Sequence, residues 1–347
     1  MANADIEFRC LCEDILENGI SNEGQKVRTV WPDGTPAYTI AKFGVVQRYD
    51  LSKEYPVLTL RKSAIKSATD EMLWIFQKKS NRVSELGSHV WDQWADKEGT
   101  IGKAYGYQLG IKHRCKDVTE DGIRKAFPNA IRAEGRFDKD CIPQYDNLDS
   151  YGQALDHRIV EEYIDREMGE PRVVAYRFPY GPWFMDQIDK VIYDLVNQPF
   201  SRRIMTSIWN PEDLDDMALQ PCAWNVSFMV EQRPGHDKLT LNMVLNQRSQ
   251  DVLAALDWNS IQYSMLQTFM AQVTNMEVGE FMHVITNCHI YDRHVPIVRE
   301  LITRDPQPAP KVWVNPEIKD FYAFTKDDVE LQDYQVAGPQ VKFEVAI

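Results

Sequence analysis

One cysteine, Cys222, stands in the chain between two groups of arginines. Arg202 and Arg203 precede it, and Arg248 follows within the run Gln247-Arg248-Ser249-Gln250-Asp251. A cysteine attacks as its thiolate, and nearby guanidinium groups both stabilise a thiolate and bind phosphate through paired hydrogen bonds. These residues could therefore bind an anionic substrate and attack it, at phosphorus or at another electrophilic atom.

The composition of the chain limits its partners. With 347 residues, of which 44% are hydrophobic, the chain can form one large domain or two ordinary domains with a buried core. The net charge of −13 gives a long-range field that repels nucleic acid and anionic membranes. No segment approaches the ~18 consecutive apolar residues that a membrane span needs. We therefore expect no nucleic-acid or membrane partner.

The cysteines indicate the redox environment. The six cysteines form no CxxC pair and no paired zinc-ligand spacing, and the chain does not begin with an apolar signal segment. We expect a reduced, cytoplasmic protein without a metal site.

Hydrophobic spacing predicts the elements that must position Cys222 and the arginines. It favours helices at 5–18, 62–78, 183–197 and 259–276, and strands at 37–49, 225–231, 238–247, 281–290 and 311–315. Arg233-Pro234-Gly235-His236-Asp237 is typical of a hairpin turn between the second and third of these strands. The mixture predicts an α+β fold, with helices packed on a mixed or antiparallel sheet.

Residues 113–182 differ from the rest of the chain in being polar and rich in Pro, Gly and Asp. We expect a single catalytic domain over 1–347 that carries these residues as a largely irregular surface insertion. The one regular element predicted within it is a helix near Leu155 to Met168. The insertion could cover the entrance of the site, although a position on the outer surface is favoured.

Separated segments of the chain together resemble the thymidylate synthase family. The resemblance covers about residues 5–112 and 183–347; any one segment alone is weak, but the ordered set is specific. It implies an α+β methyltransferase that converts dUMP to dTMP, with 5,10-methylenetetrahydrofolate as the donor of carbon and hydride. The segments are Val27-Arg28-Thr29, Val90-Trp91-Asp92-Gln93-Trp94-Ala95-Asp96, Ala104-Tyr105-Gly106, Phe200-Ser201-Arg202-Arg203, Pro221-Cys222, Gln247-Arg248-Ser249-Gln250-Asp251, Trp258-Asn259, His289-Ile290-Tyr291-Asp292-Arg293-His294 and Val345-Ala346-Ile347.

The resemblance implies a catalytic set of three residues. Cys222 would add to C6 of the pyrimidine and make C5 a carbon nucleophile, which divides one hard substitution into easier steps. Glu71 and Tyr105, with water, would handle the protons at C5 and O4. Burial among Met72, Leu73 and Trp74 would bring the pKa of Glu71 toward the working range.

The resemblance also implies the groups that bind dUMP. The asparagine would pair with uracil O4 and N3–H, because an amide offers both a donor and an acceptor. The histidine and the tyrosine would bind the 3′-hydroxyl, and the arginines, two of them supplied by the other subunit of a homodimer, would hold the phosphate. The residues are Arg28, Arg202, Arg203, Gln247, Arg248, Ser249, Asn259, His289 and Tyr291.

Trp91, Trp94, Asp251 and Ala346 would lie on the folate side of the site. By resemblance, Asp251 would hydrogen-bond the pterin ring. Trp91 and the tail Val345-Ala346-Ile347 would exclude water, so that hydride rather than water completes the reaction.

Each assignment has a local alternative that the sequence leaves open. Cys222 could be a buried core thiol, Glu71 an exposed helical glutamate and Asn259 a helix N-cap. Trp91 could simply pack in the core, and His289 and Tyr291 could be a structural pair.

The chain departs from the common family pattern at several positions. Ala223 replaces the histidine that often follows the cysteine, Asp257-Trp258 replaces a Pro-Phe pair, and Asn287 replaces an aspartate. Two other functions therefore stay open: a dUMP hydroxymethylase on the same scaffold, and a catalytically silent nucleotide-binding relative.

Overall fold

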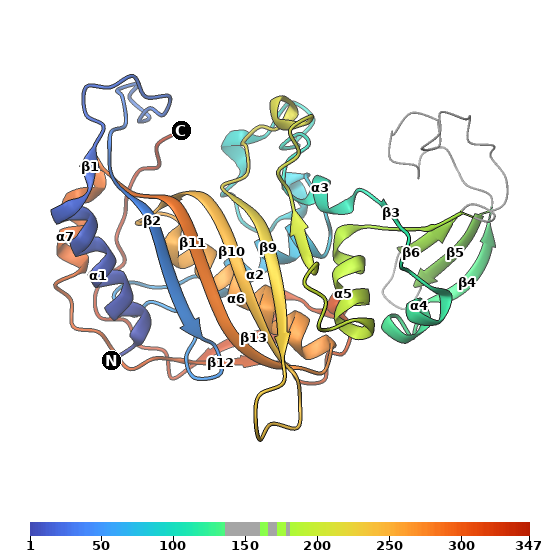
Figure 1. The fold of residues 1–347 in the computed structure, drawn as a ribbon. Helices are drawn as coiled ribbons and strands as arrows, with labels where there is room; N and C mark the ends of the chain where they lie inside the picture. Colours follow the sequence, from blue (N-terminus) through green and yellow to red (C-terminus); the bar gives the residue numbers. More distant parts are fainter. Residues whose placement is uncertain (136–159, 166–171, 178–180) are drawn as a thin grey trace.

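A six-stranded sheet forms the centre of the protein, in a computed structural model that describes residues 1–135, 160–165, 172–177 and 181–347 (Figure 1). The strand order is β1-β2-β11-β10-β9-β8, and β10 pairs with β11 in parallel while the other neighbours are antiparallel. The strands are β1 (Ile20–Ser21), β2 (Thr39–Asp50), β8 (Met205–Ser207), β9 (Ala223–Glu231), β10 (Thr240–Asp251) and β11 (Glu277–Tyr291).

Two helices cover one face of this sheet. The helix α6 (Leu256–Val273) connects the parallel strands β10 and β11 and is buried along most of its length, because the sheet lies on one side and α2 (Ile65–Phe76) on the other. The helix α1 (Asn3–Asn18) packs on β2 and β11 and ends at Gly19. The helix is buried on nearly all sides, as its place in this middle layer requires.

The opposite face of the sheet carries exposed apolar side chains. Val46 on β2 and Met229 on β9 are exposed, whereas Tyr49 on β2 and Phe228 on β9 point into the core. Alternate residues of a strand face opposite sides, so this pattern gives the sheet one covered and one uncovered face.

A second, antiparallel sheet forms from the segment predicted to be irregular. Its order is β3-β7-β6-β5-β4, and α5 (Gln187–Asn197) lies between it and the central sheet (Figure 1). The elements of this part are β3 (His113–Cys115), α4 (Glu120–Ala126), β4 (Ile131–Gly135), β5 (Val160–Asp165), β6 (Arg172–Arg177) and β7 (Trp183–Met185).

Two sequence predictions in this part are wrong. Val160–Asp165, expected within a helix, is strand β5 between β4 and β6, and 183–185 is a strand that precedes α5. Strand pairing with distant segments overrides the local preference of a short apolar stretch. The remainder of the expected helix near Leu155 to Met168 lies outside the described residues, and the assignment of one domain with an insertion stays a prediction.

The other elements agree with the hydrophobic spacing within a few residues. The β9–β10 hairpin, α1, α2, α6 and β11 all form where they were expected, and the α+β prediction is confirmed. The remaining elements are α3 (Gly106–Gly110), α7 (Val295–Leu301) and the two-stranded pair β12 (Lys311–Val314) and β13 (Val329–Gln332). In the part of the chain that the structure describes, no helix has the length and apolar character of a membrane span.

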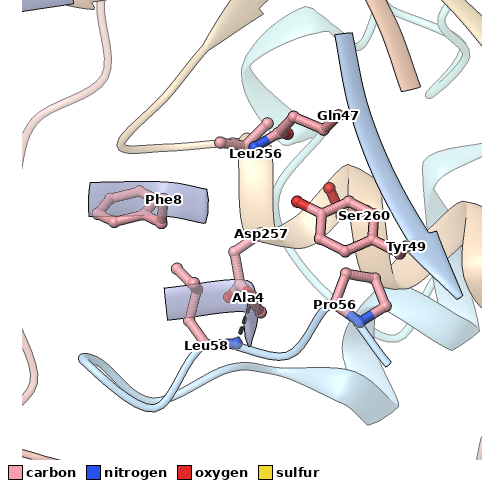
Figure 2. A pocket seen from close by; sticks show the side chains of 9 residues that line it. All are labelled: Ala4, Phe8, Gln47, Tyr49, Pro56, Leu58, Leu256, Asp257 and Ser260. Carbon is pink, nitrogen blue, oxygen red and sulfur yellow. Dashed lines mark hydrogen bonds between the residues drawn. The ribbon is translucent and has the colours of Figure 1, made fainter. Parts of the chain in front are cut away.

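A small pocket lies between α1, β2 and the start of α6 (Figure 2). Gln47, Asp257 and Ser260 contribute polar atoms to it, while Ala4 and Phe8 supply apolar surface. Its volume of about 10 Å³ leaves room for about one water molecule and is far too small for a nucleotide. The residues singled out from the sequence gather elsewhere, at the ends of β9, β10 and β11.

Candidate active site

Cys222 lies immediately before β9, where the pairing of β9 with β10 becomes irregular. The register shifts between Asn246 and Gln247, and Gln247 then pairs with Ala223. The Arg248 amide donates to the carbonyl of Cys222 at 2.8 Å. Irregular pairing of this kind redirects side chains and is common beside active sites.

The guanidinium of Arg248 is fixed by the backbone that leads to the cysteine. Its Nε donates to the Pro221 carbonyl at 2.9 Å, and its Nη2 donates to the Gln220 carbonyl at 2.7 Å. The guanidinium carbon also lies 5.9 Å from the centre of the Trp209 ring. Arg248 is therefore held beside Cys222 in the absence of any ligand.

The Cys222 thiol is half-buried, and its pKa is shifted in the direction opposite to the one expected from the nearby arginines. Burial raises its pKa, while Arg248 and then Arg28 lower it. The arginines favour the thiolate, as expected, but burial outweighs them. A buried thiol of raised pKa is protonated at neutral pH, so the site must remove that proton before attack.

Tyr105 supports the backbone of Cys222. The Cys222 amide donates to the Tyr105 hydroxyl oxygen at 3.3 Å. Tyr105 has φ +46°, a conformation that costs energy for a non-glycine residue and is concentrated at functional sites. The next residue must be glycine, because a Cβ on Gly106 would lie 2.3 Å from the Ser80 carbonyl oxygen.

Glu71 is buried, and both of its carboxylate oxygens accept hydrogen bonds from indoles. Trp91 Nε1 donates to Oε1 at 3.0 Å, and Trp258 Nε1 donates to Oε2 at 2.7 Å. Burial raises the pKa of Glu71, and the two indole donors lower it. The alternative of an exposed helical glutamate is therefore wrong.

A chain of hydrogen bonds orients the amide of Asn259. Gln247 Nε2 donates to the Ser249 carbonyl at 2.9 Å and to Asn259 Oδ1 at 3.4 Å, and Asn259 Nδ2 donates to Gln262 Oε1 at 3.2 Å. Since a carbonyl only accepts, this places Gln247 Oε1 toward His283 Nε2, 2.9 Å away, and His283 must donate there. Burial lowers the pKa of His283 to about 3, so its imidazole is neutral.

These contacts, together with two pairs of sequence neighbours, connect the residues in a closed circuit. The Tyr105 and Trp91 rings meet edge to face at 5.0 Å, and Trp91 and Trp258 both hold Glu71. Asn259 follows Trp258 in α6 and contacts Gln247, which precedes Arg248, and the Arg248 amide returns to Cys222. The structure thus brings together residues of α2, the loop before α3, β9, β10 and α6.

His289 and Tyr291 lie next to this circuit at the end of β11. Their rings meet edge to face at 5.0 Å, and His289 pairs in register with Asp251 of β10. Burial lowers the pKa of His289, and Arg28 and Cys222 both act on the pKa of Tyr291. The Tyr291 side chain therefore lies near both the thiol and the exposed Arg28, and His289 contacts Tyr291.

Asp251 begins the turn that leads from β10 into α6. Its Oδ1 accepts from the amides of Leu253 and Ala254, each at 3.0 Å, and His294 Nδ1 lies 3.7 Å from the same oxygen. The described residues give Asp251 Oδ2 no hydrogen bond, which leaves that oxygen for a ligand.

The tail, residues 345–347, is docked beside these residues. The Ile347 amide donates to the Val30 carbonyl at 2.9 Å, and the Val30 amide donates to the Ile347 carbonyl at 2.8 Å. Ala346 packs with Trp31, Ala37 and Tyr291. The segment that carries Arg28 and the tail are therefore fixed to each other.

Arg202, Arg203 and Trp94 lie farther from the circuit than the other predicted residues do. Arg202 and Arg203 are exposed, and neither acts on the pKa of Cys222. Trp94 reaches it only through Trp91, at 5.4 Å between rings. Within one chain, the described structure leaves the two arginines apart from the thiol.

The residues that depart from the common family pattern also lie at the site. Ala223 is buried at the start of β9, and Asn287 Oδ1 lies 2.8 Å from His289 Nδ1. Asn259 is not the N-cap of its helix, because α6 begins at Leu256 after Ala255. Trp258 and His283 were missed as site residues, because no local pattern relates them to Glu71 and Gln247.

Comparison with known proteins identifies the family to which this fold and site belong. The family model described as thymidylate synthase matches residues 6–347. The chain therefore belongs to the thymidylate synthase family and is an enzyme of the methyltransferase class, as the sequence predicted.

Similar proteins occur in Bacillus species and one of their phages. The chain is 37% identical to thymidylate synthase 1 of Bacillus spizizenii and 36% identical to the thymidylate synthase of Bacillus phage phi3T, over the full length of each. The solved structure of thermostable thymidylate synthase A from Bacillus subtilis is 36% identical, with a TM-score of 0.73 over 99% of both chains. Among the described residues, no cluster of His, Cys, Asp and Glu could hold a metal ion.

Proposed function

We propose that this enzyme converts dUMP to dTMP with 5,10-methylenetetrahydrofolate as co-substrate, releasing dihydrofolate. The observation that carries the proposal is the closed circuit that joins Cys222, Tyr105, Glu71, Asn259 and Arg248. A nucleophile, a buried carboxylate and a base-reading amide lie in one continuous network, as an addition to a pyrimidine ring requires.

Cys222 is the nucleophile of the proposed reaction. Its sulfur forms a bond to C6 of the pyrimidine after loss of the thiol proton, and electron density moves toward C5 and O4. Arg248 and Arg28 favour the thiolate, and the same guanidinium groups are available to the substrate phosphate. The Tyr105 hydroxyl and the Arg248 amide hold the backbone of Cys222 in place.

Glu71 handles the protons at C5 and O4 in this scheme. Its raised pKa brings the carboxyl closer to neutral pH, where a group can both give and take a proton. The Tyr105 ring packs edge to face on Trp91, whose indole donates to Glu71, so Tyr105 lies near the same carboxylate.

Asn259 selects uracil. Its amide orientation is set by Gln247 and Gln262, so the second lone pair of Oδ1 and the second proton of Nδ2 are available for N3–H and O4 of the base. Cytosine presents the reverse pattern at these two positions. The proposed ligands of the 3′-hydroxyl, His289 and Tyr291, lie on β11, which pairs with β10.

Trp91, Trp94 and the docked tail close the folate side. Asp251 Oδ2 is the acceptor proposed for the pterin ring, and Ala346 lies over Tyr291. A bulky indole and a fixed tail exclude water from the reacting carbon, which favours hydride as the final donor.

We also propose that the enzyme acts as a homodimer through the uncovered face of the central sheet. Val46 and Met229 expose apolar surface there, which a second copy would bury. Arg202 and Arg203, apart from the thiol of their own chain, would then reach the phosphate bound by the partner. A cytoplasmic location remains the expectation from the cysteine pattern.

One assay tests the reaction. The protein is incubated with dUMP and methylenetetrahydrofolate, dihydrofolate is followed by absorbance, and the pyrimidine product is identified by mass. Dihydrofolate with dTMP is expected. Tetrahydrofolate with hydroxymethyl-dUMP would instead indicate the hydroxymethylase, and no product would indicate a silent nucleotide-binding protein.

A cysteine variant tests the proposed nucleophile. Cys222→Ser should lose at least about 10³-fold in kcat while still binding dUMP, because an alcohol is far less ionised than a thiol. Turnover close to that of the wild type would overturn the assignment of Cys222.

A further inference from the structure

Trp258 holds Glu71 more closely than Trp91 does. Its Nε1 lies 2.7 Å from Glu71 Oε2, against 3.0 Å between Trp91 Nε1 and Oε1. The two residues of the shorter bond are 187 positions apart in the sequence and come from different helices, α6 and α2. The bond therefore depends on how the two helices pack.

The carboxylate is surrounded by groups without formal charge. Among the described residues, no Lys, Arg or His contributes to the pKa of Glu71. Tyr105, from the loop before α3, and Tyr263, from α6, are the titratable groups coupled to it, and burial raises the pKa of both, so they are neutral. The ionised form of Glu71 is therefore stabilised by the two indole N–H groups and by Gln262, in place of a cation.

Trp258 also connects Glu71 to the base-reading residue. Asn259 directly follows Trp258 in the first turn of α6. Its Nδ2 donates a hydrogen bond to Oε1 of Gln262, one turn later. A rigid helix transmits the position of one side chain to its neighbour better than a loop does. The distance from Glu71 to Asn259 is thus fixed through Trp258.

We propose that Trp258 is a positioning residue, whose indole clamps Glu71 together with Trp91 and fixes the proton-handling carboxylate relative to Asn259. Its catalytic meaning rests on the proposed function, but the clamp itself can be measured in the free enzyme. Phenylalanine at this position would keep the aromatic packing and remove the donor.

Indole 15N NMR of the tryptophan-labelled full chain tests the clamp without substrate. The Nε1–H signals of Trp258 and Trp91 should shift with one common midpoint as Glu71 titrates, and Glu71→Gln should abolish both shifts. The Trp313 signal, from a half-exposed indole on β12, should not follow this titration. A Trp258 signal that ignores pH, or that titrates unchanged in Glu71→Gln, would overturn the proposal.

The variant Trp258→Phe tests the consequence. Loss of one donor should raise the midpoint seen through Trp91 by about one pH unit, since a hydrogen bond to a charged group corresponds to about that shift. The apparent pKa of Glu71 in the pH profile of kcat should rise by the same amount. The control variant Trp313→Phe should change neither the NMR midpoint nor this apparent pKa. An unmoved midpoint in folded Trp258→Phe would contradict the clamp.

The two hypotheses fail in different ways. If the wild-type enzyme makes no dTMP, the proposed function is wrong, yet the NMR titration still decides whether Trp258 holds Glu71. If Trp258→Phe does not fold, as judged by near-UV circular dichroism, the wild-type and Glu71→Gln titrations decide the question alone.

Discussion

The docked tail offers a prediction whose size follows from the structure. Ile347 and Val30 exchange two backbone hydrogen bonds, at 2.8 and 2.9 Å. Each contributes about 0.5–1.5 kcal/mol net, so their joint loss corresponds to about 1–3 kcal/mol. At about 1.4 kcal/mol per factor of ten, deletion of Ile347 should shift the tail toward its undocked state by about 5- to 150-fold.

The deletion has a matched control in Ile347→Ala. That substitution keeps both backbone hydrogen bonds and removes only a side chain that is 44% exposed. If docking excludes water from the reacting carbon, deletion should lower the rate of dTMP formation by a factor that approaches the shift in the docking equilibrium. It should also raise the share of hydroxymethyl product, whereas Ile347→Ala should stay close to the wild type.

Product analysis by mass, beside the dihydrofolate rate, measures both effects at saturating substrates. Equal rates and equal products for the deletion and for Ile347→Ala would refute the reasoning, because the variants differ in the backbone bridge to Val30. A rate loss without any hydroxymethyl product would refute the water-exclusion step alone.

Two other variants test the base-reading network. Asn259→Asp replaces the donor Nδ2 by an acceptor, so kcat/KM for dUMP should fall by about tenfold or more and dCMP should become a substrate; unchanged selectivity would remove Asn259 from base recognition. His283→Leu leaves the buried Gln247 Oε1 without its donor, which should cost about 1–3 kcal/mol of unfolding free energy in denaturant melts and weaken dUMP binding in equilibrium titrations. A His283→Leu protein with wild-type stability and affinity would show that Gln247 needs no such support.

Much of the central sheet follows from local sequence. The β9–β10 hairpin is predicted because an alternating strand, a turn rich in Pro, Gly and Asp, and a second strand are contiguous. The helix α6 is predicted because a helical stretch of this length with many apolar residues is expected to lie within the core. The strand β5 was missed because its stability comes from β4 and β6, which local periodicity cannot report.

The chemistry of the site can be predicted from residue types and their order: a cysteine with arginines near it in the chain, an asparagine that can read uracil, and a glutamate on an apolar helix face. These depend on residue type and order, which the chain carries directly. The protonation of these groups, in contrast, depends on how the chain packs. At Cys222, burial raises the pKa of the thiol more than Arg248 and Arg28 lower it. At Glu71, two indoles that are distant in sequence donate hydrogen bonds to the carboxylate. Desolvation and contacts across the packed layers of α2, α6 and the sheet set proton affinity, and neither exists until the chain has folded.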